Sequence, residues 1–476
     1  MESTKINKND IIVGNIMEGC DRLIFDSTAS DYMTPEMGLL IGQALAKDRR
    51  VVVVGVDYMR SSLMMKNALV SGLLSSGVDV IDIGYVPAPV ITEAAGMGDC
   101  AVYVTEGENY GLISGFMILD SNGDLFDKEE LRKLDWVIRL CPESSKPMAV
   151  GRLIRKEGMI ESYKQRMISG FDHSINCSVI LDCSYGSCSL CAPQILDKLG
   201  ADVVTLNAQR DRNHDLDCGT VKESGLRTIK RFIGSLPGTI GIFLNRMGTK
   251  VRLVDEQHEN VPFGILEAIV TRFMKPGKVV VSFDETRLVE DALFNRVMTV
   301  SDSRLCLESP FSEQDDVEIH YCSPGLENIC EAMRKNSADL GFYRGNIIFS
   351  DGPLFPDGIR VAVILSQIAS LNSIHNLIDE ISIYERVSTQ ERFDCERKAF
   401  ESCFDQYSGR TYSVVRRFDE GWRIEMDKGW ASISFSSADS NLLDIIAESR
   451  DHAYLVGMME MIKSDIRACT SGVGSQ

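Results

Sequence analysis

One unit recurs three times along this chain: an apolar, β-branched run, a helix, and a second apolar run. The three units begin with the runs at 51–54, 179–181 and 279–281. A strand, a helix and a strand in that order form a parallel sheet with the crossover helix on its face. A hairpin-like pair at 241–244 and 251–256 adds antiparallel neighbours. The recurrence therefore predicts three similar α/β domains with mixed sheets flanked by helices.

The first unit has the clearest element boundaries. Thr34-Pro35-Glu36 carries helix-start signals, because threonine caps a helix, proline suits its first turn and glutamate favours its positive end. A strand is expected at 50–55, a helix at 61–76 and the next strand at 78–83.

The pattern changes after about residue 386. A helix is expected at 390–404, followed by strands at 422–426, 430–435 and 442–447 and a closing helix at 452–466. Alternating strands beside helices predict a smaller α+β domain with an antiparallel sheet. The sequence thus predicts domains at 1–150, 151–262, 263–383 and 384–469, and a disordered tail at 470–476.

Length and charge narrow the class of protein. The chain has 476 residues, enough for three or four domains with buried cores, and a formal net charge of −19. This charge argues against nucleic acid or an anionic membrane as the main partner. No signal-like start and no apolar run of about 18 residues is present, so we expect a cytoplasmic protein.

Three of the fourteen cysteines have a spacing that can indicate a metal site. Cys183, Cys188 and Cys191 follow a C-x4-C-x2-C pattern, which can hold part of an iron–sulfur site. They fall, however, across the end of a predicted strand, a turn and the start of a helix. We therefore expect reduced thiols that pack as small hydrophobic side chains.

A polar loop follows the predicted strand at 101–104. Ligands of open α/β sheets lie at the carboxyl ends of strands, so this loop is a candidate for function. It resembles the loop Thr-Ala-Ser-His-Asn-Pro-Pro-Glu-Tyr-Asn-Gly-Phe-Lys of the α-D-phosphohexomutases (phosphoglucomutase, phosphomannomutase and phosphoglucosamine mutase), whose serine carries the transferred phosphoryl group. The matching residues are Thr105, Asn109, Gly115 and Phe116. Gly107 stands where the resemblance implies the nucleophile.

The resemblance extends over essentially the whole chain and implies a second motif in the first domain. The family sequence Gly-Arg-Asp-Thr-Arg-x-Ser-Ser falls on residues 55–62. Asp57 and the two serines are retained, while both family arginines are replaced. Arg60 lies beside the second of these positions, so Asp57 and Arg60 join Thr105 and Asn109 as remnants of the family site.

The family's metal loop, Asp-Gly-Asp-Gly-Asp-Arg, holds Mg²⁺ through three carboxylates. The aligned residues 245–250 have Asn245, Met247 and Thr249 in the three carboxylate positions. An amide, a thioether and a hydroxyl are poor ligands for a hard cation. We therefore expect no metal and no other cofactor in this chain.

Two further family loops are altered. The sugar-recognition loop Gly-Glu-x-Ser-Gly-His aligns with 341–346, and the phosphate clamp aligns with 434–443 without its arginines. Residues that could still line a ligand cleft are Lys250, Tyr343, Arg344, Asn346, Ser436 and Ser437.

Two functions follow from this pattern. The first is a catalytically inactive homologue, a pseudoenzyme, with a binding or regulatory role. The second is a working phosphosugar mutase, an isomerase of carbohydrate metabolism, whose rebuilt site uses the remnants together with Lys250 and Arg344. For partners, we expect a homodimer or a heterodimer with an active mutase, and a phosphosugar-like small molecule, but no nucleic acid and no membrane.

Overall fold

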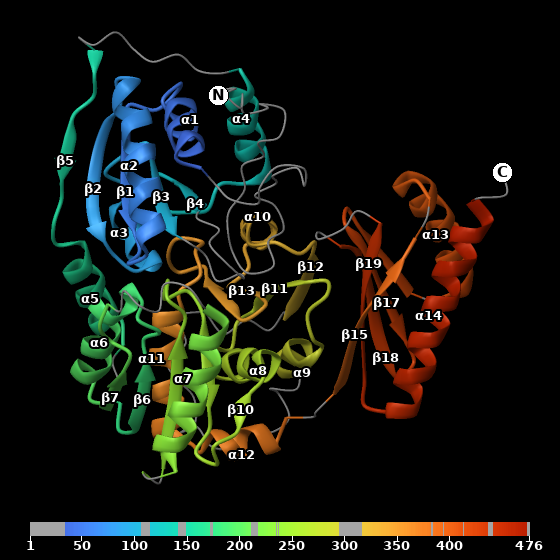
Figure 1. Cartoon of the computed structure of the whole chain (residues 1–476). Coiled ribbons are helices and arrows are strands. Elements are labelled where there is room, and N and C mark those ends of the chain that lie inside the picture. The colour runs from blue at the N-terminus through green and yellow to red at the C-terminus, as the bar shows by residue number, and fades with distance from the viewer. Residues whose placement is uncertain are drawn as a thin grey trace.

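Four β-sheets, each accompanied by helices, follow one another along the described part of the chain (Figure 1). The computed structural model describes residues 34–105, 115–140, 149–171, 175–210, 218–234, 236, 238–294, 317–381, 384–393, 395–412, 414–436 and 441–473, without the side chains of 218–224 and 471–473. The predicted α/β class is confirmed.

The first sheet has the strand order β4-β3-β1-β2-β5. Its strands are β1 (Val51–Val56), β2 (Asp79–Tyr85), β3 (Cys100–Thr105), β4 (Gly115–Asp120) and β5 (Leu153–Arg155). The helices of this part are α1 (Pro35–Leu45), α2 (Arg60–Ser75), the 3-10 turn Ala88–Val90, α3 (Ile91–Ala95) and α4 (Lys128–Arg139). Side chains of β1 alternate between two cores, because Val52 and Val54 pack with α1 and α2 while Val53 faces α3.

The helices α1 and α2 pack very closely at glycines. A Cβ atom at Gly42 would lie 2.4 Å from the Leu69 carbonyl oxygen, and one at Gly72 would lie 2.1 Å from the Leu39 carbonyl oxygen. Only glycine permits this approach. The helix α1 begins directly after Thr34, as predicted, although the Thr34 hydroxyl makes no capping hydrogen bond.

The strand β5 corrects the first predicted domain border. Residues Leu153–Arg155 pair in parallel with β2, so they belong to the first sheet. The border therefore falls after Arg155 and not at 150/151. The sequence offered little sign of this pairing, because a three-residue edge strand has no periodicity to recognise.

The second sheet has the order β10-β9-β8-β6-β7. Its strands are β6 (Ser178–Asp182), β7 (Asp202–Leu206), β8 (Thr239–Leu244), β9 (Val251–Val254) and β10 (Asn260–Val261). The helical segments of this part are α5 (Met159–Ser169), the 3-10 turn Ser187–Leu190, α6 (Ala192–Lys198) and α7 (Cys218–Ile233). The predicted hairpin is confirmed by the antiparallel pairing of β8 with β9.

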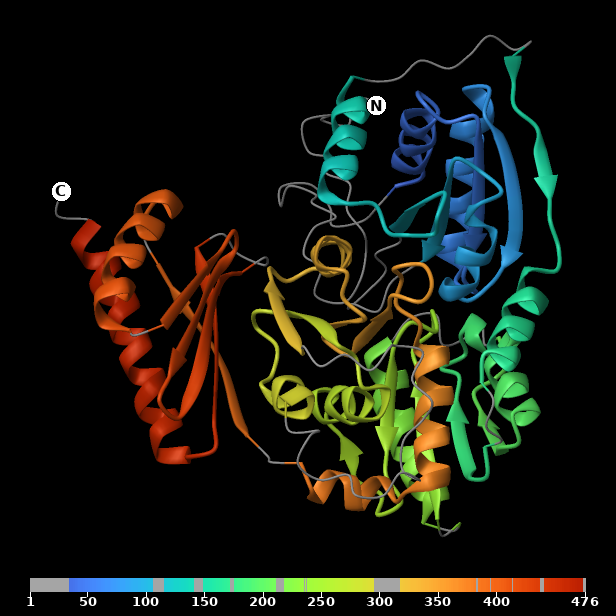
Figure 2. The same ribbon diagram turned by 180° about the vertical axis from the view of Figure 1, so that it is seen from behind.

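The third sheet, β12-β11-β13-β14, shares a core with the second. Its strands are β11 (Lys278–Ser282), β12 (Glu318–Cys322), β13 (Leu340–Tyr343) and β14 (Asn346–Phe349), and its helices are α8 (Phe263–Met274), α9 (Leu288–Phe294), α10 (Leu326–Asn336), α11 (Gly358–Leu371) and α12 (Ile374–Asp379). The helix α11 contacts β8, β9 and α6, and Figure 2 shows it beside the second sheet. One continuous apolar core therefore joins the two units.

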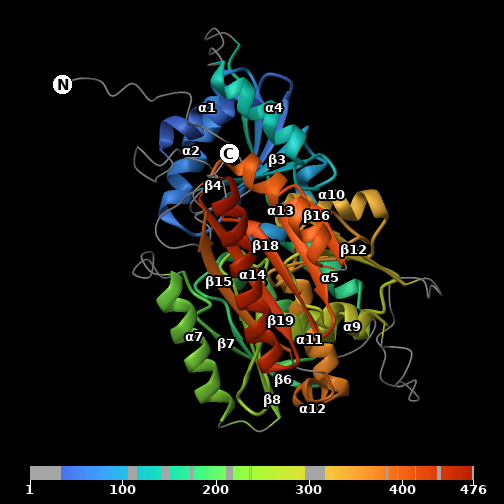
Figure 3. The same ribbon diagram turned by 90° about the vertical axis from the view of Figure 1, so that its right-hand side faces the viewer.

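The C-terminal sheet is entirely antiparallel, in the order β15-β19-β18-β17-β16, as the predicted α+β domain requires. Its strands are β15 (Glu385–Arg392), β16 (Val414–Phe418), β17 (Gly421–Met426), β18 (Gly429–Phe435) and β19 (Leu442–Ser449), and its helices are α13 (Arg397–Thr411) and α14 (His452–Val473). Both helices cover the face of the sheet that points away from the third sheet (Figures 1 and 3).

Two expectations for this domain were wrong, and one strand was missed. Residues 390–392 belong to the edge strand β15, so the helix predicted at 390–404 begins only at Arg397, and the strand β16 was missed. Pairing with β19 along the whole length of β15 outweighs the helix propensity of its glutamate, glutamine and arginine residues. The helix α14 continues to Val473, past the expected start of a disordered tail at 470, and the Thr470 hydroxyl donates to the Ile466 carbonyl within it.

None of the helices in the described segments is both long and apolar enough to cross a membrane.

Candidate functional site

Asp57 and Thr105 lie side by side at the carboxyl ends of β1 and β3. The Thr105 hydroxyl donates a 2.7 Å hydrogen bond to Asp57 Oδ2, and the Met59 amide donates to Asp57 Oδ1 at 2.9 Å. Both side chains are buried. The two strands are parallel neighbours, so residues that are 48 positions apart in sequence meet at the edge where sheets of this kind usually bind ligands.

Not every predicted remnant can be located. Arg60 is the first residue of α2 and is exposed. Gly107, Asn109 and Ser437 lie outside the described residues.

The turn at 245–250 is closed by the side chain of Asn245. Its Oδ1 accepts hydrogen bonds from the Thr249 amide at 2.8 Å and from the Lys250 amide at 3.1 Å. Its Nδ2 donates to Thr249 Oγ1 at 2.8 Å. Because Asn245 and Thr249 are both buried, their polar atoms are used within the turn itself.

The same turn joins three parts of the chain. The Met247 carbonyl accepts a 2.9 Å hydrogen bond from the Ala88 amide beside the first sheet, and the Gly248 carbonyl accepts one of 3.0 Å from the Gly358 amide at the start of α11. The Met247 side chain is buried in the shared core. The backbone of this turn is therefore a structural junction.

These residues do not fit Mg²⁺. The amide oxygen of Asn245 already accepts two backbone N–H groups, Met247 offers only a thioether, and the Thr249 hydroxyl is taken by an amide donor. Arg246 and Lys250 add positive charge in the same turn. In the described residues, no group of three or more histidine, cysteine, aspartate or glutamate side chains could hold a metal ion. A hard divalent cation prefers several carboxylate or carbonyl oxygens that are not already bonded.

The loop between β13 and β14 is held by buried acids that the sequence alone did not indicate. The Arg344 amide donates to Glu285 Oε2 at 3.1 Å, and the Gly345 amide donates to Glu267 Oε1 at 2.9 Å. The Arg344 guanidinium reaches Asp284 Oδ2 at 3.3 Å. Burial, and secondly the Glu285 carboxylate, raise the pKa of Glu267 well above its usual value. These acids fix the loop conformation, including the left-handed backbone of Arg344.

Some of the residues that were predicted to line a ligand cleft lie close to one another in the structure. Lys250 forms an antiparallel bridge with Asn346, so the turn at 245–250 touches the β13–β14 loop. The Asn346 side chain is buried and donates to the Tyr343 carbonyl at 3.0 Å. The side chain of Arg344 is 44% exposed and is the most accessible of this group. Ser436 lies apart, directly after β18 of the C-terminal sheet, and its amide donates to the Leu442 carbonyl.

Aromatic and cationic side chains occupy the ends of β1 and β2. The Arg210 guanidinium lies 5.5 Å from the ring centre of Tyr58 and 4.8 Å from that of Tyr85. Arg246 Nη1 lies 3.5 Å from Met59 Sδ. These contacts tie the second unit to the first through Tyr58 and Met59, which stand in the positions of family motif residues.

The three cysteines behave as predicted, as parts of a core. Cys183, Cys188 and Cys191 are buried and pack in the apolar core that also contains Ile195. The Cys188 thiol donates to the Cys183 carbonyl. Burial raises the pKa of the Cys191 thiol, which disfavours the thiolate that binds metals.

Comparisons with known proteins match the first unit to a family model and most of the chain to named relatives. The sequence profile for "Phosphoglucomutase/phosphomannomutase, alpha/beta/alpha domain I" matches residues 22–138. A "Probable phosphoglucosamine mutase" from Methanococcoides burtonii is 26% identical over 88% of this chain and 93% of its own length. A "Phosphoglucosamine mutase" from Methanocaldococcus jannaschii is 25% identical over 86% of this chain and 90% of its own length.

Solved structures show the same fold. A phosphoglucomutase/phosphomannomutase family protein from Burkholderia thailandensis superposes with a TM-score of 0.72 at 18% identity, covering 92% of this chain and 94% of that one. The open form of parafusin, a phosphoglucomutase from Paramecium, gives a TM-score of 0.69 at 11% identity, covering 92% and 93%. The architecture is thus that of the multi-domain sugar phosphomutases. The match at residues 22–138 and the relatives that cover most of the chain support the α-D-phosphohexomutase family for this protein.

Proposed function

We propose that this protein is a non-catalytic member of its family, which uses the fold for binding or regulation. The observation that carries the proposal is the Asn245 side chain, which closes the 245–250 turn by three hydrogen bonds where the family resemblance implies a metal ligand. Gly107 has no hydroxyl that could carry a phosphoryl group. Groups that act as a unit in catalysis lose almost all of their effect when one is removed.

One observation favours an enzymatic alternative. The Thr105 hydroxyl donates to a carboxylate at 2.7 Å, and such a partner can activate a hydroxyl as a nucleophile. In this second proposal, the chain is an active phosphosugar mutase, as its relatives are named, with Thr105 in place of the serine. The burial of Thr105 in this structure weighs against it.

The deciding experiment is incubation with labelled glucose 1,6-bisphosphate and Mg²⁺, beside an active phosphohexomutase as positive control. We expect neither a phosphorylated protein nor isomerised glucose or mannose phosphate. Turnover that survives purification and is lost in a Thr105→Val variant would replace the first proposal by the second. Valine keeps the shape of threonine and removes only the hydroxyl.

A binding role requires a ligand or a partner, and here we propose a phosphosugar-like molecule and either a second copy of this chain or an active mutase, in the cytoplasm. The cationic residues Lys250 and Arg344 near the bridge to Asn346 support an anionic ligand. Affinity purification from the native cell with mass spectrometry tests the partner. Recovery of neither excess copies of the chain nor a mutase would leave the regulatory role without support.

A further inference from the structure

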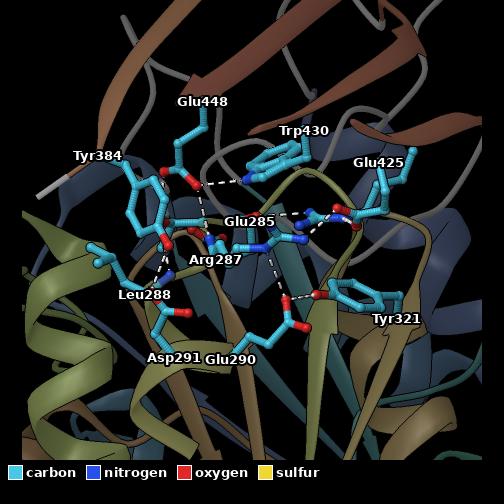
Figure 4. A network of polar contacts seen from close by, with 12 residues as sticks. Glu285, Arg287, Leu288, Glu290, Asp291, Tyr321, Tyr384, Glu425, Trp430 and Glu448 are labelled. Atoms are coloured by element: carbon cyan, nitrogen blue, oxygen red, sulfur yellow. Dashed lines mark hydrogen bonds and ion pairs between the residues drawn. The ribbon is translucent and has the colours of Figure 1, made fainter. Parts of the chain in front are cut away.

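The segment at 283–287 follows β11, the strand that pairs with both β12 and β13. The carboxyl end of a central parallel strand is where α/β sheets usually bind ligands. In this protein, residues of the C-terminal domain contact that segment through the network in Figure 4.

Glu448 of β19 is the centre of this network. Its Oε1 accepts a 2.6 Å hydrogen bond from the Thr286 hydroxyl, and its Oε2 accepts 2.9 Å from the Arg287 amide and 2.6 Å from Trp430 Nε1. Two donors come from the third unit and one from the C-terminal domain. Since Glu448 is buried, loss of its carboxylate would leave several donors without an acceptor.

Arg423 of β17 makes a second connection. Its side chain is 0% exposed, and Nη1 donates to the carbonyl oxygens of Phe283 at 2.8 Å and Glu285 at 3.0 Å. The guanidinium stacks 3.8 Å from the ring centre of Trp430. Its Nη2 is buried without a hydrogen-bond partner, so we assign the larger share of the attachment to Glu448.

Ion pairs surround these two residues. Arg287 Nη2 reaches Glu425 Oε2 at 2.7 Å, and Arg450 Nη2 reaches Asp291 Oδ2 at 2.9 Å, so each pair crosses the same boundary. By contrast, Lys128 of α4 and Glu420 of the C-terminal domain form a bridge at 3.2 Å with side chains that are 30% and 43% exposed. Exposed pairs of this kind contribute little, whereas buried, multiply bonded groups are costly to separate.

We propose that Glu448 and Arg423 form a latch that keeps the C-terminal domain docked on the third unit. In the latched state the two parts move as one body, and Arg423 occupies the edge of the third sheet where α/β sheets usually bind ligands. The latch is a property of the fold and holds whether or not the protein is an enzyme.

Hydrogen exchange measured by mass spectrometry on the full chain tests the latch. Amides at 283–287 and in β17 and β18 should exchange slowly in the wild type. In Glu448→Ala their exchange should accelerate by about tenfold to a hundredfold on both sides of the boundary, because separation of the domains becomes easier. Small-angle scattering should show a larger radius of gyration for the same variant.

If Glu448→Ala does not fold, two less disruptive variants and one control variant at an exposed glutamate still test the proposal. Trp430→Phe keeps an aromatic ring and removes one donor, and Glu448→Gln keeps one acceptor oxygen, so both should give a smaller acceleration at the same amides. Glu420→Gln makes the same chemical change at the exposed bridge and should leave exchange unchanged. Wild-type exchange on both sides as fast as in Glu448→Ala, or folded Glu448 and Trp430 variants that exchange like wild type, would overturn the proposal.

Discussion

Replacement of Asn245 by alanine tests the interpretation of the 245–250 turn. The change removes both acceptor interactions of Oδ1 and the donor interaction of Nδ2, and it leaves the buried amides of Thr249 and Lys250 without their acceptor. At about 1 kcal/mol for each of the three hydrogen bonds, the free energy of unfolding should fall by about 3 kcal/mol. The melting temperature should fall by about 3–6 °C.

Thermal and urea denaturation of the wild type, Asn245→Ala and Asn245→Asp provide the measurement. Aspartate keeps acceptor oxygens for the amides of Thr249 and Lys250, loses the donor, and adds a negative charge to the turn that carries Arg246 and Lys250, so it should cost about 1 kcal/mol. The expected order of stability is wild type, then Asn245→Asp, then Asn245→Ala. An alanine variant within about 0.5 kcal/mol of the wild type would refute the reasoning, since that is the range of ordinary surface substitutions.

A magnesium titration of the same proteins separates a structural turn from a metal site. A site filled at about 100 times its dissociation constant would add about 2.7 kcal/mol to stability. We expect no Mg²⁺-specific rise in melting temperature for the wild type, with sodium chloride of equal ionic strength as control. A specific rise that Asn245→Ala abolishes would show that the turn has been rebuilt as a metal site.

Three further changes have definite expected outcomes. Burial raises the pKa of Asp182 from 3.8 to about 6, so the folded protein holds this proton more tightly than the unfolded chain does. The contribution of Asp182 to the free energy of unfolding should therefore fall by up to about 3 kcal/mol as pH rises through this range, and Asp182→Asn should remove that fall in urea titrations at several pH values. Gly186→Ala would place a Cβ atom 2.3 Å from the Arg246 carbonyl oxygen and should lower stability by about 2–3 kcal/mol in the same assay. Gly457→Ala, on α14 with no atom within 4 Å of its Cβ, should raise stability by about 0.5–1 kcal/mol; a loss there, or tolerance at Gly186, would contradict the packing described.

The candidate site could be predicted only in part. The sequence motifs singled out Thr105, Asp57 and Asn245, and each of these residues makes a buried hydrogen bond in the structure. It did not indicate Glu267 or Glu285, which hold the β13–β14 loop, because a glutamate inside a helix or after a strand looks locally like any surface acid. Their role arises only when α8 and the end of β11 pack beside that loop.

The sequence by itself determined the parallel units with their central strands and the antiparallel character of the last domain. Those features depend on side-chain periodicity and β-branched runs, which act within a few residues of one another. The resemblance to the family also predicts that Gly107 stands in the position of the nucleophile, and Asn245, Met247 and Thr249 in the positions of the metal carboxylates.

The tertiary structure alone decided which strand each edge segment joins and how the domains attach. The strand β15 forms against helix-favouring side chains because β19 offers backbone partners along its full length. Glu448 meets Thr286 across 162 positions of sequence, and Arg423 meets Phe283 across 140. Contacts of this kind leave no pattern in the neighbouring sequence. Their energy depends on burial and on donor geometry, and both exist only after the domains have docked.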